Sequence, residues 1–139
     1  MNAREGRAYA GGVNSTVARI ATWVLAGVIG FVYGVAGVIG QAAAWGPIPI
    51  GLVVALVGLI ALLVAVRTLT GERGSTLGAG VGALVATVIL SGQGPGGSVV
   101  VPAPAEGEIT TGVIWTFAVP LIAALIVAWP AAPARRTTN

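Results

Sequence analysis

Few residues in this chain have side chains that do chemistry, and the one acidic pair in a loop is Glu106 and Glu108. Paired carboxylates bind a cation or exchange protons when a site holds them together. These two flank a glycine in a stretch rich in glycine and proline, where two solvated carboxylates are the simpler interpretation. The sequence has no histidine and no cysteine. We therefore expect no catalytic residues, no metal site, no cofactor and no enzymatic activity.

Two glutamines are the other polar side chains that bear on function. Gln41 and Gln93 each lie at the end of an uncharged apolar run, which makes them candidates for a shared polar cup. No Asp, Glu, Lys, Arg or His lies in the middle of any such run. Coupled transporters usually place ionisable groups there. The sequence thus disfavours coupled transport, although backbone or hydroxyl groups can also coordinate a substrate.

Small residues at helix-packing spacing form the clearest pattern. The candidate helix-packing residues are Gly27, Gly30, Gly34, Gly37, Gly78 and Gly82. Lipid gives helices no hydrophobic drive to associate, so close backbone approach and dispersion carry more of the stability, and glycine permits that approach. Two interpretations stay open, namely packing within one chain and a face that binds a second copy or a partner helix. A GxxxG spacing alone does not decide between them.

The elements that carry these residues are four long apolar segments. Of the 139 residues, 56% are hydrophobic and only 8% are charged, whereas a soluble domain has about 25% charged residues. A helix that crosses a bilayer needs about 20 apolar residues. We predict an all-α fold, a four-helix transmembrane bundle over residues 20–129. The predicted spans are 20–44, 50–66, 76–93 and 109–129.

The segments between and beyond the spans differ in character. Two prolines one residue apart, Pro47 and Pro49, cannot continue a helix and predict a tight turn after the first span. Residues 94–108 form a long loop, in which a run of valines is a candidate for a short extended segment. The tails are residues 1–19 and 130–139. We expect the first of these tails to be disordered or to lie on the membrane surface.

The arginines predict how the chain is oriented. All seven basic residues are arginines, and with the N-terminus inside they all fall on the cytoplasmic side. Arginine is enriched in cytoplasmic loops, so both termini are predicted to be cytoplasmic. The arginines flank apolar segments and do not cluster on one face, so we expect no nucleic-acid partner. An odd number of spans would break this partition of charge.

The chain resembles a family of small four-helix integral membrane proteins of actinobacteria whose function is unknown. The resemblance rests on the glycine-rich first span, on Trp45-Gly46-Pro47, and on the segment Gly94-Pro95-Gly96-Gly97-Ser98-Val99-Val100-Val101-Pro102. It covers residues 20–130. The resemblance implies the four-helix fold but carries no activity and no functional residues.

Two kinds of function fit these observations. The first is a non-catalytic accessory or assembly subunit of the plasma (inner) membrane, in which glycine-rich helix faces bind a membrane-protein partner or a second copy. The alternative is a subunit of a small transporter or channel, in which Gln41 and Gln93 line a vestibule. The lipid bilayer is the one partner that composition alone predicts.

Overall fold

The computed structural model describes residues 3–92 and 107–130, and this part of the chain is all-helical. The helices are α1 (Ala3–Gly40), α2 (Ile50–Thr70), α3 (Arg73–Ser91) and α4 (Thr111–Ala128). Each is long and apolar enough to cross a membrane, with Asn14–Gly40 as the candidate span in α1. The predicted four-helix transmembrane fold is therefore confirmed, and the chain is a multi-pass membrane protein.

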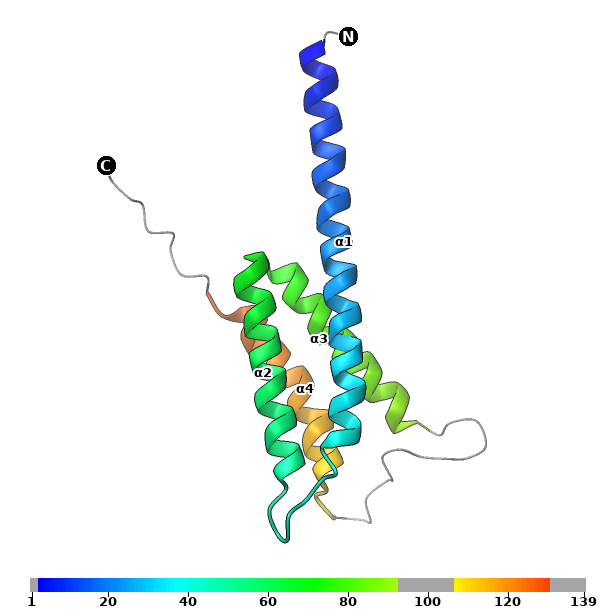
Figure 1. Ribbon diagram of the computed structural model, residues 1–139, viewed down its shortest axis with the longest axis vertical. Helices are drawn as coiled ribbons and strands as arrows, with labels where there is room; N and C mark the ends of the chain where they lie inside the picture. Colours follow the sequence, from blue (N-terminus) through cyan, green and yellow to red (C-terminus); the bar gives the residue numbers. More distant parts are fainter. Residues whose placement is uncertain (1–2, 93–106, 131–139) are drawn as a thin grey trace, which may run out of the picture.

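The four helices form a bundle in which α1 and α3 cross obliquely, while α2 and α4 lie together on one side (Figure 1). The most extensive packing is between α1 and α3. The N-terminal part of α1 projects past the ends of the other helices (Figure 1). At about 1.5 Å per residue, the 38 residues of α1 measure about 57 Å. This length exceeds the hydrocarbon thickness of a bilayer, about 30 Å.

The first tail is helical, because α1 already begins at Ala3, so the predicted disorder is wrong for residues 3–19, while the alternative of a segment on the membrane surface stays a prediction. The polar side chains in this region do not interrupt the helix. The hydroxyls of Ser15 and Thr16 both donate to the carbonyl of Gly12, at 2.9 and 3.0 Å, and so stay bonded to their own helix. The second tail, from residue 131 on, lies outside the described residues.

The other helix ends differ from the predicted spans by a few residues. The first helix ends at Gly40 rather than at residue 44, and α2 continues past residue 66 to Thr70. The hydroxyls of Thr68 and Thr70 donate to carbonyls one turn back, at 3.0 and 2.7 Å, so that polar residues extend the apolar helix. The predicted third and fourth spans become Arg73–Ser91 and Thr111–Ala128.

The predicted turn after the first span is present. The backbones of Trp45 and Ile48 exchange two hydrogen bonds, of 3.0 and 3.2 Å, around Gly46 and Pro47. Gly46 has a φ of 61°, a conformation that residues with a side chain rarely adopt. The predicted loop over residues 94–108 and its valine run lie outside the described residues, except for Gly107 and Glu108.

A sharp corner joins α2 to α3. Gly71 ends α2 in the left-handed conformation, with a φ of 65°, and its N–H donates to the carbonyl of Arg67 at 3.0 Å. This is the usual way in which glycine ends a helix. Glu72 is extended, and α3 begins at the next residue. Two residues thus suffice to reverse the chain, which brings the start of α3 beside α1.

The centre of the bundle is filled by large side chains. Trp115, Leu59 and Leu63 are almost wholly buried, and small residues of α3 such as Ala83 surround them. The Trp115 indole N–H donates to Thr87 Oγ1 at 3.1 Å. This bond satisfies a polar group that lipid or core would leave without a partner.

Replacing Trp115 by alanine tests this core. We expect Trp115→Ala to lower the free energy of unfolding by about 3 kcal/mol, because a cavity costs about 24 cal/mol per Å³. Trp129→Ala is the matched control, because Trp129 is 71% exposed. The measurement is unfolding in mixed micelles followed by circular dichroism. Equal losses of stability in the two variants would contradict the proposed role of Trp115.

Candidate functional site

The predicted helix-packing glycines of α1 lie against α3. A Cβ atom on Gly30 would stand 2.7 Å from the Cα of Ala79, and one on Gly34 would stand 2.7 Å from the carbonyl oxygen of Ala83. Real Cβ atoms essentially never come within 3.0 Å of such neighbours. At both positions the neighbour is rigid backbone, so α1 and α3 approach this closely only because a side chain is missing.

The glycines of α3 are the other half of the same contact. A Cβ on Gly78 would lie 2.8 Å from the carbonyl oxygen of Trp23, and one on Gly82 would lie 2.8 Å from the backbone nitrogen of Phe31. Gly27 faces Gly78, with ordinary contact at 3.5 Å from a built Cβ to the Gly78 carbonyl oxygen. The two glycine faces therefore meet each other within one chain, and we call this the α1–α3 contact.

Gly37 serves a different neighbour. A Cβ there would overlap the indole ring of Trp115, which belongs to α4. The small residue in α1 thus makes room for the largest buried side chain of the bundle. Of the six predicted packing residues, five lie in the α1–α3 contact and the sixth lies against α4.

Other glycines also make room for neighbours, and the spacing pattern did not single them out. Gly58 of α2 lies under the phenol of Tyr33, whose hydroxyl donates to the carbonyl of Ala55 at 2.9 Å. Gly74 lies under the indole ring of Trp23, and Gly80 lies against Ala123. Gly74 lies four residues before Gly78 and continues the glycine spacing of α3, whereas Gly58 and Gly80 belong to no such series. A side chain at any of the three positions would overlap a residue that is distant in the sequence, namely Tyr33, Trp23 or Ala123.

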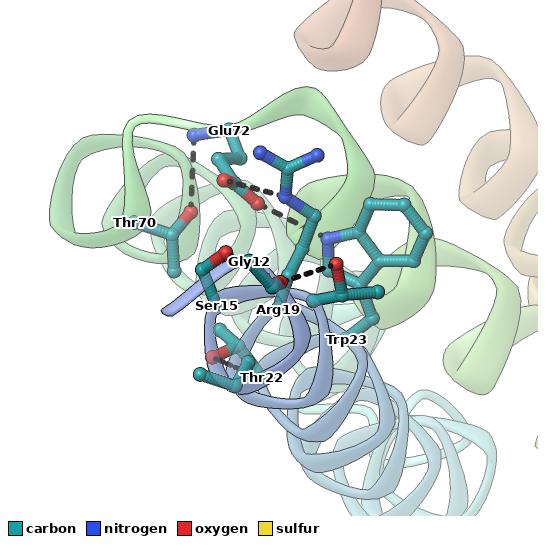
Figure 2. A network of polar contacts seen from close by, with 9 residues as sticks. Gly12, Ser15, Arg19, Thr22, Trp23, Thr70 and Glu72 are labelled. Atoms are coloured by element: carbon teal, nitrogen blue, oxygen red, sulfur yellow. Dashed lines mark hydrogen bonds and ion pairs between the residues drawn. The ribbon is translucent and has the colours of Figure 1, made fainter. Parts of the chain in front are cut away.

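A polar cluster lies where the α1–α3 contact reaches the α2–α3 corner (Figure 2). The carboxylate of Glu72 pairs with Arg19, with 3.4 Å between Oε1 and Nε, and accepts the indole N–H of Trp23 at 3.2 Å. The Glu72 backbone N–H donates to Thr70 Oγ1 at 3.4 Å. We call Arg19, Trp23 and Glu72 the corner cluster. It ties the corner to α1 just beyond the glycines.

The polar residues considered for chemistry are not brought together in the described part of the chain. Glu108 is exposed, while Glu106 and Gln93 lie outside the described residues. Gln41 is only 4% exposed, and its Oε1 is buried without a hydrogen-bond partner. It therefore does not line an open vestibule in this conformation. No group of three His, Cys, Asp or Glu residues is close enough to hold a metal in residues 3–92 and 107–130.

Comparisons with protein-family models, with curated proteins and with solved structures find no match for this chain. The resemblance to small actinobacterial membrane proteins therefore stays a prediction.

The α1–α3 contact predicts opposite outcomes for one substitution at two glycines of α1. Gly30→Ala forces α1 away from Ala79 and should lower the free energy of unfolding by about 1–3 kcal/mol, as overpacked cores do. Gly40→Ala should be neutral or slightly stabilising, because nothing lies within 4 Å of its Cβ. Unfolding in mixed micelles measures both. A Gly30→Ala variant as stable as Gly40→Ala would refute the close contact.

The corner cluster predicts a weak, salt-sensitive coupling. Arg19 and Glu72 are partly exposed, and pairs of this kind contribute about 0–1 kcal/mol. A double-mutant cycle of Arg19→Gln and Glu72→Gln should give a coupling energy below about 1 kcal/mol that vanishes near 1 M salt. Glu72→Ala should destabilise more than Glu72→Gln, because only the amide still accepts the Trp23 N–H. A large coupling that persists in high salt would contradict this assignment.

Proposed function

We propose that the chain is a non-catalytic accessory or assembly subunit of the plasma (inner) membrane, with both termini in the cytoplasm. The observation that carries this proposal is the shape of α1. Its candidate span begins at Asn14, while the helix itself begins at Ala3 and projects past the rest of the bundle (Figure 1). Within the described residues no other helix reaches this end of α1, which leaves it within reach of a partner (Figure 1).

The place of contact differs from the one that the sequence suggested. The glycines expected to bind a partner helix already face Ala79, Ala83 and each other inside the chain. They are therefore not free to bind a second copy or another protein in this conformation. The projecting end precedes the candidate span, which begins at Asn14, and its sequence contains Arg4, Glu5 and Arg7. We therefore place the partner contact there.

The bundle interior supports a non-catalytic role. Its described core consists of aliphatic residues, alanines and Trp115, and the buried polar side chains are Gln41, Ser75, Thr76 and Thr87. None of these four is an acid, a base or an activated nucleophile. A transporter or channel subunit, the alternative, needs a polar path through the bilayer. The apolar centre around Leu59 and Leu63 does not favour one.

Removing the projecting end should release the partner and spare the bundle. We expect a tagged chain lacking residues 1–12 to lose a protein that the full chain retains in mild detergent, as seen by quantitative mass spectrometry. A chain lacking residues 131–139 is the control and should retain that protein. The stability of the bundle should change little, and the helical content should fall only by the residues removed. Retention of the same protein by the shorter chain, or purification of the full chain without any stoichiometric partner, would count against the proposal.

The orientation is tested by labelling single cysteines, since the natural chain has none. Ile48→Cys and Leu69→Cys place thiols at exposed positions in the first turn and near the α2–α3 corner. With cytoplasmic termini, a membrane-impermeant maleimide should label Ile48→Cys in intact cells and label Leu69→Cys only after lysis. The reverse pattern would place both termini outside.

A further inference from the structure

An apolar groove runs along the bilayer-facing side of the bundle between α2 and α4. Its volume is about 460 Å³, which falls in the range of small-molecule sites. Its walls are aliphatic, formed by Ile60, Val64, Ile122, Leu125 and Ile126. From residue 60 to residue 67 the groove follows α2 for about 10 Å. It is shaped for an apolar chain that lies parallel to the helices.

The guanidinium of Arg67 lies at one end of this groove. Arg67 lies in the last turn of α2, and its Nη2 donates to the backbone carbonyl of Trp129 at 2.9 Å. Its Nη1 is buried and has no hydrogen-bond partner among residues 3–92 and 107–130. Arg19 and Glu72 form the one ion pair of the described residues. No carboxylate among these residues therefore neutralises Arg67. A buried donor of a charged group without an acceptor is costly, which points to an anionic acceptor beyond the described residues.

We propose that this groove binds one anionic membrane phospholipid, with an acyl chain along α2 and α4 and its phosphate on Arg67. Three features select this occupant. The walls accept hydrocarbon, the groove opens to the bilayer, and the guanidinium lies near the helix end, at the depth where phosphates lie. The charge of the guanidinium also favours a headgroup with a net negative charge over a zwitterionic headgroup, in which a choline neutralises the phosphate. This site is independent of the partner contact proposed for α1.

Native mass spectrometry of the full-length chain in mild detergent tests the site. The probes are phosphatidylglycerol and phosphatidylcholine with identical acyl chains. We expect the natural chain to retain one phosphatidylglycerol about tenfold more strongly than phosphatidylcholine, and Arg67→Gln to lose that preference. Arg73→Gln is the matched control, because it removes the same charge from an exposed residue outside the groove and should keep the preference.

A groove-filling variant separates lipid from a free anion and leaves Arg67 intact. Val64→Trp should reduce retention of both lipids, whereas Val57→Trp, on the exposed face outside the groove, should not. The proposal is overturned if the natural chain shows no preference for phosphatidylglycerol, or if Arg73→Gln loses it as fully as Arg67→Gln. It is also overturned if millimolar inorganic phosphate displaces the lipid while Val64→Trp has no effect.

Discussion

The arrangement of this bundle depends on how closely the backbones of α1 and α3 approach each other. In lipid, apolar side chains gain nothing by leaving their solvent, so helices associate through dispersion between well-fitted surfaces. Here the fit is backbone on backbone, since Gly30 meets Ala79 and Gly34 meets Ala83 with no room for another carbon. The same contact carries the start of α3 to α1, where Glu72 and Arg19 meet. The short corner at Gly71 makes that placement possible.

The contacts of α1 with α2 and α4 pair a large side chain with a glycine. Trp115 and Tyr33 each reach across to a glycine on a neighbouring helix and satisfy their polar atoms on Thr87 and Ala55. Trp115 thus joins α4 to α1 and α3, and Tyr33 joins α1 to α2. The groove that ends at Arg67 lies between these two helices. The bundle therefore combines a close backbone contact between α1 and α3 with an apolar groove between α2 and α4.

Much of the fold was predictable because bilayer physics is simple. Four uncharged runs gave four helices, and Pro47 with Pro49 gave the first turn. The helix ends were less predictable, since Ser15, Thr68 and Thr70 satisfy their hydroxyls on their own helix and extend it into polar sequence. The spacing of the glycines predicted that they pack against a helix but not which helix that is. A contact within one chain and a contact between two chains need the same spacing. The groove was not predictable at all, since no single segment contains it.

The central claim is that the glycine faces of α1 and α3 meet within one chain, and solid-state NMR of the natural chain in bilayers tests it without any substitution. A built Cβ on Gly34 lies 2.9 Å from the Cβ of Ala86, so these residues should give a strong through-space cross peak. The peak should persist when uniformly labelled chains are diluted into unlabelled ones. It should be absent when glycine-labelled and alanine-labelled chains are mixed. A peak that is lost on dilution and present in the mixed sample would make the glycine faces an interface between copies and contradict the account.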